Sequence, residues 1–106
     1  MDARKIESYL GFALRAKKLA QGLNNIQTLK KGVYCLLLDG EAQKNSQKQA
    51  KKLQERFSCP LIIVSGLGAL LKREGCKIAA LQDESLAGAI IREAKAQGIC
   101  IEGAIG

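Results

Sequence analysis

Short apolar runs alternate with longer amphipathic segments along this chain, and that alternation restricts the fold more than any other feature. Three runs are too short for buried helices and are typical of strands, namely residues 33–38, 61–64 and 77–81. Residues 6–14 and 43–57 carry apolar side chains at helical spacing, with polar residues between them. Helices that separate buried strands must cover both faces of a sheet, so we expect one three-layer α/β/α domain.

The remaining segments are shorter and less regular. We expect residues 19–22 to form a connection, followed by a second helix that ends at Gly32. Ser85 is placed to N-cap a last helix. Residues 98–106 are apolar and glycine-rich and receive no assignment. The predicted domain therefore occupies the whole chain, 106 residues long, with its core at about residues 4–97.

The chain contains no histidine, which removes the commonest general base and a common metal ligand. Two carboxylate pairs follow predicted strands: Asp39 with Glu41, and Asp83 with Glu84. Such pairs can do acid–base work, hold magnesium or cap the helix that follows. We favour the capping role because both pairs lie in predicted turns. We therefore predict no catalytic residue and no enzymatic activity.

Neither a cofactor nor a metal ion is predicted. Gly66 and Gly68 follow a strand like half of a dinucleotide fingerprint, but Leu71 occupies the third glycine position, so a tight turn is favoured. The four cysteines are far apart in the sequence: Cys35, Cys59, Cys76 and Cys100. Four-thiolate zinc sites normally bring their ligands in close pairs. No signal peptide or membrane-spanning run is visible, so we expect reduced thiols, a cytoplasmic location and no membrane partner.

Positive charge is concentrated in the first half of the chain. Seventeen Lys and Arg against ten Asp and Glu leave a net charge of +7. All of it belongs to residues 1–57, because residues 58–106 carry five charges of each sign. A polyanion is therefore the first partner to consider. One face of the helix predicted at 43–57 carries Lys44, Lys48, Lys51 and Lys52. This face is either simply solvated or part of an interface with the polyanion.

The second predicted helix begins with a glycine and two amide side chains, in the stretch Gln21-Gly22-Leu23-Asn24-Asn25. Backbone N–H groups at helix N-termini bind phosphates, and asparagine offers a donor and an acceptor to base edges. Asn24 as a plain N-cap is the alternative, although it leaves Asn25 unexplained. Four lysines bracket this helix: Lys17, Lys18, Lys30 and Lys31.

The order and spacing of several motifs resemble the kink-turn RNA-binding ribosomal proteins of the L-seven-Ae and L-thirty-e group, particularly their small bacterial members. The motifs are Leu10-Gly11 with Arg15-Ala16-Lys17-Lys18-Leu19, then Gly22-Leu23-Asn24-Asn25-Ile26, then residues 41–48 after a strand, and Leu67-Gly68. They extend over roughly residues 6–91. The resemblance implies a three-layer α/β/α sandwich with a small mixed sheet, and a non-catalytic, RNA-binding function.

The resemblance also implies a site around the second helix. Gly22 would let the backbone approach the tandem sheared G·A pairs of a kink-turn, while Asn24 and Asn25 would contact guanine edges and nearby backbone. Gln43 would contact an extruded nucleotide, which the loop at 73–77 would cover. The implied RNA-binding residues are Lys17, Lys18, Gln21, Gly22, Asn24, Asn25, Thr28, Gln43, Arg73, Glu74, Gly75, Cys76 and Lys77.

Five positions depart from the family pattern. Asn25 stands where glutamate is usual, Thr28 where many members have a phosphate-binding lysine, and Gln21 where others also have lysine. Lys17 and Lys72 each occupy the place of a glycine. The substitutions at Asn25 and Thr28, together with the apolar tail, motivate a second hypothesis, a protein-interaction module on the same fold that has lost specific RNA binding. The first hypothesis expects a structured RNA as partner, with ribosomal RNA, the ribosome or another ribonucleoprotein as candidates.

Overall fold

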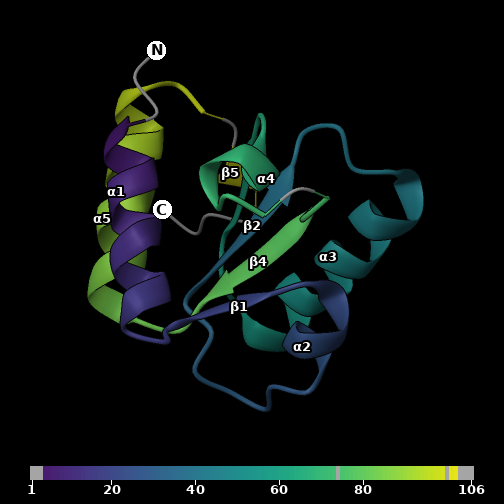
Figure 1. Ribbon diagram of the computed structural model, residues 1–106. Coiled ribbons are helices and arrows are strands. Elements are labelled where there is room, and N and C mark those ends of the chain that lie inside the picture. Colours follow the sequence, from purple (N-terminus) through teal and green to yellow (C-terminus); the bar gives the residue numbers. More distant parts are fainter. Residues whose placement is uncertain (1–3, 74, 100, 103–106) are drawn as a thin grey trace.

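Five strands of the described chain form one mixed sheet, and helices cover both of its faces (Figure 1). The computed structural model describes residues 4–73, 75–99 and 101–102. Its helices are α1 (Arg4–Arg15), α2 (Leu23–Gln27), α3 (Lys44–Phe57), α4 (Leu67–Leu70) and α5 (Glu84–Ala96). Its strands are β1 (Leu19–Gln21), β2 (Cys35–Asp39), β3 (Leu61–Val64), β4 (Ile78–Leu81) and β5 (Ile101–Glu102). The predicted α/β/α sandwich is confirmed.

The strands lie in the order β1-β4-β2-β3-β5, with β2 at the centre of the sheet. β2 and β3 are parallel, since α3 connects them as a crossover, whereas the other neighbouring pairs are antiparallel. Every residue of β2 is buried. That burial accounts for its unbroken apolar run, because a central strand with helices on both faces has no solvent-facing side.

Two hydrophobic clusters fill the layers on either side of the sheet. Cys35 and Leu37 belong to the cluster with α1, α4 and α5, while Leu36 and Leu38 belong to the cluster with α2 and α3. The separation follows from the alternation of side chains along a strand. Figure 1 shows α1 and α5 side by side on one side of the sheet, with α2 and α3 on the other.

Residues 19–22 contain a strand, so the prediction of a plain connection was wrong. β1 pairs with β4 in an antiparallel register, with Leu19 opposite Leu81 and Gln21 opposite Ala79. Three residues are too few to display the two-residue alternation of a strand. The partner that makes this segment a strand lies far along the chain, beyond the reach of a local pattern.

The second helix is shorter than predicted. α2 ends at Gln27 and does not continue to Gly32, because Thr28 forms its C-cap. The Thr28 hydroxyl donates a hydrogen bond to the backbone carbonyl of Asn25, at 2.7 Å. A side-chain hydroxyl that bonds the carbonyls of the last turn competes with continuation of the helix.

Two features of the C-terminal part also differ from expectation. The N-cap of α5 is Asp83 and not Ser85, since the Asp83 carboxylate accepts a hydrogen bond from the backbone N–H of Leu86 at 3.0 Å. The unassigned tail contributes β5, which pairs antiparallel with β3. Residues 100 and 103–106 of that tail lie outside the described residues.

Three helices end in the same hydrogen-bonded turn, in which one residue adopts a left-handed conformation. These residues are Lys17 after α1, Lys72 after α4 and Gly98 after α5, with φ angles of 58°, 54° and 72°. Each of them and the residue that follows donate backbone N–H groups to carbonyls of the last helical turn, which is the Schellman pattern. A left-handed φ favours glycine over residues that have a Cβ, yet lysine stands at two of these three positions, 17 and 72.

Candidate nucleic-acid interface

A groove of about 320 Å³ lies between the start of α2, the first turn of α3 and the segment that leads into β4. Its lining residues are Gly22, Leu23, Ser46, Arg73, Gly75, Cys76, Lys77 and Ile78. The pairing of β1 with β4 brings these segments together, because the Gly22 N–H donates to the Ile78 carbonyl at 3.0 Å. The structure therefore gathers the predicted Gly22 and most of the predicted loop at 73–77 on one surface.

Gly22 forms the N-cap of α2, with φ 89° and ψ 146°. A Cβ at this position would meet no described atom within 4 Å, so the backbone conformation and not the available space calls for glycine. Asn24 is exposed and is the second residue of the helix, so the interpretation of Asn24 as the N-cap was wrong. The first N–H groups of a helix have no intrahelical acceptors, and no side chain caps them at the start of α2.

Asn25 and Thr28 are engaged within α2 itself. The Asn25 side-chain amide donates to the backbone carbonyl of Gln21 at 2.8 Å, which ties the helix to the end of β1. Thr28 caps the opposite end of the helix and does not line the groove. The side chains of Asn25 and Thr28 therefore stabilise α2 locally.

Arg73 reaches across from the loop before β4 to the end of β1. Its Nη1 donates to the side-chain oxygen of Gln21, at 3.4 Å, and the contact is exposed. The predicted residue Gln21 thus contacts Arg73, which lines the groove, but does not line the groove itself. Glu74, also predicted here, lies outside the described residues.

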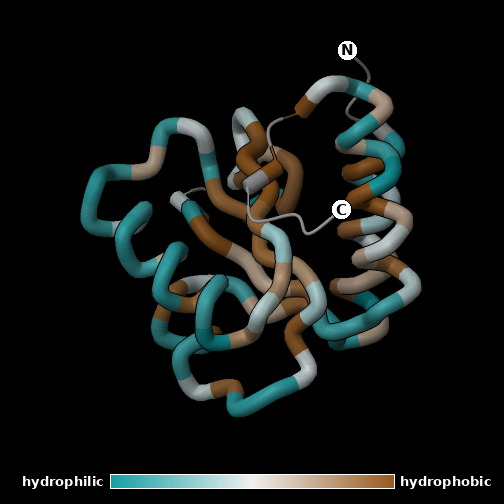
Figure 2. The backbone as a smooth tube through the Cα atoms, turned by 180° about the vertical axis from the view of Figure 1, so that it is seen from behind, coloured by the Kyte–Doolittle hydropathy of each residue, from teal (hydrophilic) through white to brown (hydrophobic). Residues whose placement is uncertain are grey.

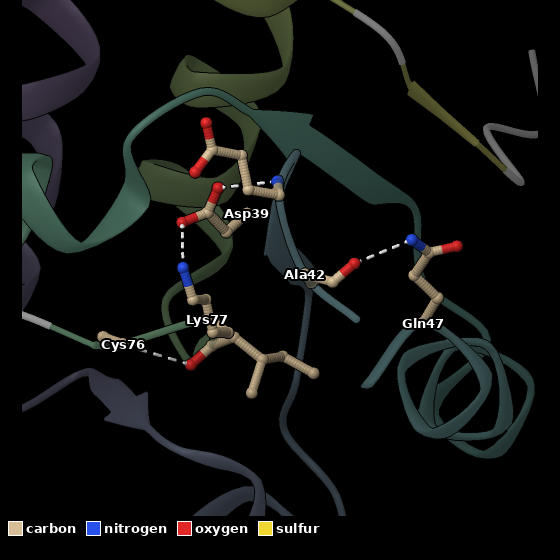
Figure 3. Close-up of polar contacts among 7 residues, drawn as sticks. Asp39, Ala42, Gln47, Cys76 and Lys77 are labelled. Atoms are coloured by element: carbon tan, nitrogen blue, oxygen red, sulfur yellow. Dashed lines mark hydrogen bonds and ion pairs between the residues drawn. The ribbon is translucent and has the colours of Figure 1, made fainter. Parts of the chain in front are cut away.

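Lys77 forms an ion pair with Asp39 at the groove (Figure 3). The distance from Lys77 Nζ to Asp39 Oδ2 is 3.4 Å, and the Asp39 side chain is only 7% exposed against 44% for Lys77. The other carboxylate oxygen of Asp39 accepts from the backbone N–H of Glu41 at 2.9 Å. Asp39 therefore bonds the turn after β2 but does not cap α3, whose N-cap is Gln43. The favoured helix-capping role is confirmed for Asp83 and was wrong for Asp39, which is buried at the end of β2.

Gly68 determines where the groove-lining segment runs. A Cβ there would lie 2.9 Å from the Arg73 carbonyl oxygen and 3.5 Å from the Gly75 nitrogen. The Arg73 N–H also donates to the Gly68 carbonyl at 2.8 Å. The Leu67-Gly68 motif thus allows the backbone before β4 to pack directly against α4.

Other predicted residues lie away from the groove. Gln43 is the exposed N-cap of α3, and its neighbour Ser46 lines the groove instead. Lys17 and Lys18 precede β1 at the end of the strand opposite Gly22, roughly 10 Å away for a strand of this length. The Lys18 carbonyl accepts from the Gln82 N–H at 2.7 Å. These lysines therefore add charge at the end of β1 that lies away from the groove.

Arg56 of α3 is a structural residue that the sequence pattern did not single out. Its guanidinium donates to the carbonyls of Gln27 and Leu29, at 3.1 and 2.6 Å. It also lies over the Phe57 ring, 5.2 Å from the ring centroid. Arg56 therefore holds the end of α2 against α3 and helps to orient the start of α2 in the groove.

Three cysteines are free and buried: Cys35, Cys59 and Cys76. Burial raises the pKa of the Cys59 thiol to about 11 and raises the pKa of Cys35 further still, with the nearby Cys59 adding to the effect. Cys100 lies outside the described residues. Among the residues that the structure describes, no group of three His, Cys, Asp or Glu side chains is placed to hold a metal ion.

Within the described ranges, no helix has both the length and the apolar character needed to cross a lipid bilayer.

No family model and no curated protein matches this chain. A solved structure of a protein of unknown function from Bacillus halodurans is similar to it, with a TM-score of 0.67 and 19% sequence identity. The match covers 81% of this chain and 92% of that chain. At this identity the likeness establishes the fold that the two chains share.

Proposed function

We propose that this chain is a non-catalytic RNA-binding module that recognises a structured RNA. The target is a kink-turn or a related internal loop with sheared G·A pairs. The observation that carries the proposal is the groove in which Gly22, Arg73 and Lys77 meet, although they come from distant parts of the sequence. This groove combines uncapped backbone donors with a guanidinium and an ammonium group.

The chemistry of these groups suits RNA. Arginine presents paired donors to phosphates and to the edge of guanine, and backbone N–H groups bind phosphate oxygens. Because Asp39 partly neutralises Lys77, the exposed Arg73 is the main cation of the groove. The extruded bases and sharp backbone turns of internal loops offer such groups a target that a regular duplex lacks.

The layer that holds the groove is also strongly basic. Exposed lysines follow α2 and extend along α3: Lys30, Lys31, Lys44, Lys48, Lys51 and Lys52. Figure 2 shows hydrophilic residues over most of the length of α3. These lysines supply a sequence-independent attraction for phosphates, which weakens as the salt concentration rises.

A mobility-shift assay with two RNAs tests the proposal. One RNA contains a kink-turn, and the other is a duplex of equal length without the G·A pairs. We expect the kink-turn RNA to bind at least about tenfold more tightly, since each paired base contact contributes about 1–3 kcal/mol of discrimination. Equal affinity for both RNAs would overturn the proposal.

Two matched pairs of variants locate the site. Arg73→Ala should weaken kink-turn binding about tenfold, whereas Arg92→Ala, an exposed arginine on α5, should leave it unchanged. Asn24→Ala should also weaken binding. Its control is Ser85→Ala, because Ser85 is likewise the exposed second residue of a helix.

The internal bonding of Asn25 and Thr28 favours the alternative, a protein-interaction module on the same fold. Purification from lysate with and without RNase separates the two. A protein complex that survives RNase supports the alternative, and release by RNase supports the RNA-binding module. We place either activity in the cytoplasm, in keeping with the free, buried Cys35, Cys59 and Cys76.

A further inference from the structure

A second hollow, of about 460 Å³, lies between α1 and α4 and is separate from the groove. Ser8, Gly11, Phe12 and Arg15 line it from α1, and Leu70 and Lys72 line it from α4 and the residues that follow. None of these residues lines the groove at α2. The proposed function therefore leaves this hollow unexplained.

Phe12 gives the hollow an aromatic surface. The chain has two phenylalanines, and Phe12 is 51% exposed and so contributes little to the core. The Arg15 guanidinium lies over its ring, 5.0 Å from the centroid. An exposed aromatic ring beside a cation is the arrangement on which proteins stack unpaired bases.

Gly11 keeps the space beside this ring open. A glycine in a helix interior is less stable than alanine. A Cβ at Gly11 would meet no described atom within 4 Å, so packing within the described chain does not require glycine here. The missing side chain leaves room on the same face of α1 that carries Ser8 and Phe12.

Lys72 connects the hollow to the groove. It keeps a left-handed conformation, with φ 54°, that glycine would adopt at lower energy, and strain of this kind concentrates at binding sites. Lys72 lines the hollow, while the next residue, Arg73, lines the groove. One RNA strand that crosses the segment after α4 would therefore meet a cation on each side.

We propose that this hollow binds an unpaired nucleotide of the RNA strand held in the groove, with its base stacked on Phe12. The base stacks on the face of Phe12 that Arg15 does not cover, and Lys72 faces its phosphates. The Glu7 carboxylate, also in the lining, can accept a hydrogen bond from an exocyclic amine. This inference rests on the proposed function. It adds to that function a preference for a single-stranded extension beside the structured loop.

The absence of tryptophan from the chain provides a direct probe. Phe12→Trp places a single indole in the hollow, and a base stacked on it quenches its fluorescence. Tyr34→Trp is the control, since Tyr34 is the other exposed large hydrophobic residue among those described, at 42%, and lines neither the hollow nor the groove. Titration uses a kink-turn RNA with a blunt end and the same RNA with a short single-stranded extension. We expect quenching for Phe12→Trp with the extended RNA only.

Affinity supplies the second readout. The extension should strengthen binding by the wild-type protein about tenfold, which is within the range for one stacked base. Phe12→Ala should lose that gain while keeping its affinity for the blunt RNA, and Phe12→Tyr should retain the gain. Because Phe12 is largely exposed, all three proteins should show the same far-ultraviolet circular dichroism.

The outcomes separate the two proposals. Tight binding of the blunt RNA, with no gain from the extension and no quenching, overturns the stacking site and leaves the proposed function intact. Quenching by the extended RNA, together with equal affinity for the blunt kink-turn RNA and the duplex without G·A pairs, supports the stacking site and overturns the proposed function. Capture of an RNase-resistant protein partner that is lost with Phe12→Ala also overturns the stacking site.

Discussion

The ends of α4 and α5 have the same backbone geometry but different residues. α5 ends with Gly98 in the left-handed position, and α4 ends with Lys72 in the equivalent one. Both turns are closed by the same pair of backbone hydrogen bonds. Gly98 lines neither the groove nor the hollow, whereas Lys72 lines the hollow beside Phe12. The comparison teaches that the same turn accepts either glycine or lysine, so a reason beyond the stability of the turn has to be sought for the lysine of α4.

The end of α1 resembles that of α4, with Lys17 in the left-handed position. Lys17 is exposed and lines neither the hollow nor the groove. It therefore offers an internal standard, because it has the same strain and the same charge but lies away from both proposed binding surfaces. Substitutions at these helix ends can separate the energetic effect of the conformation from the effect of the charge on binding.

The largest effect is expected where the end of α4 is most tightly packed. Gly68→Ala should lower the free energy of unfolding by about 2 kcal/mol, because its Cβ would lie 2.9 Å from the Arg73 carbonyl oxygen. Kink-turn binding should fall as well, since Arg73 must move. Gly88→Ala in α5 is the control: its Cβ meets no described atom within 4 Å, so it should raise stability by up to about 1 kcal/mol. Urea unfolding measures both, and equal effects would contradict this account.

Converting the end of α5 into that of α4 should have the next largest effect. Gly98→Lys should lower the free energy of unfolding by about 1 kcal/mol, because a side chain is disfavoured at positive φ. Gly98→Asn should cost less, since asparagine tolerates the left-handed region better. Thermal unfolding measures the two variants. If Gly98→Lys is as stable as the wild type, strain does not distinguish these helix ends.

The reverse substitutions test what the lysines contribute. Lys17→Gly and Lys72→Gly should each raise the free energy of unfolding by about 0.5 kcal/mol, the relief of strain being partly offset by the flexibility of glycine when unfolded. Only Lys72→Gly should selectively weaken binding of the RNA with a single-stranded extension. Lys17→Gly should weaken all RNAs alike and slightly. Equal losses for the two variants would remove the functional reason for strain at Lys72.

The smallest effect at neutral pH concerns the end of α3, where Ser58 is left-handed and the buried Cys59 follows. Burial raises the pKa of Cys59 from 9.0 to about 11, so the folded protein favours the protonated thiol. This contribution to stability is complete below pH 9 and is lost as the pH rises from 9 to about 11. Urea unfolding at pH 7, 9 and 10 should show a steeper loss for the wild type than for Cys59→Ala. Parallel curves would show that the thiol stays accessible to solvent.

Much of the fold could be predicted because its central elements carry strong local patterns. β2 and β3 are uninterrupted apolar runs, and α3 has a clear helical periodicity. β1 was missed because three residues become a strand only through pairing with β4. The end of α2 was misplaced because the Thr28 hydroxyl and the Arg56 guanidinium take carbonyls that a longer helix would use.

The candidate site was also only partly predictable. Gly22 and the loop at 73–77 were proposed from a resemblance to a known family, and Gly22 and the described residues of that loop line the groove. Ser46 also lines the groove, but its spacing from Ala50 and Leu53 indicated only that it lies on the inward face of a helix. Arg56 and the hollow around Phe12 depend on contacts between segments distant in sequence. No local pattern contains that information, because loops and helix ends are positioned by the rest of the fold.

Over the residues that the structure describes, the two outer strands of the sheet are very short, with three residues in β1 and two in β5. Exposed strand edges are templates on which further chains can add, and long edges promote aggregation and exchange of strands between molecules. Within the described residues, each edge offers only a few unpaired backbone groups to a second copy. Copies brought together by the proposed RNA would therefore find little described edge on which to add a strand. Assembly of that kind would first require β1 or β5 to detach and uncover β4 or β3.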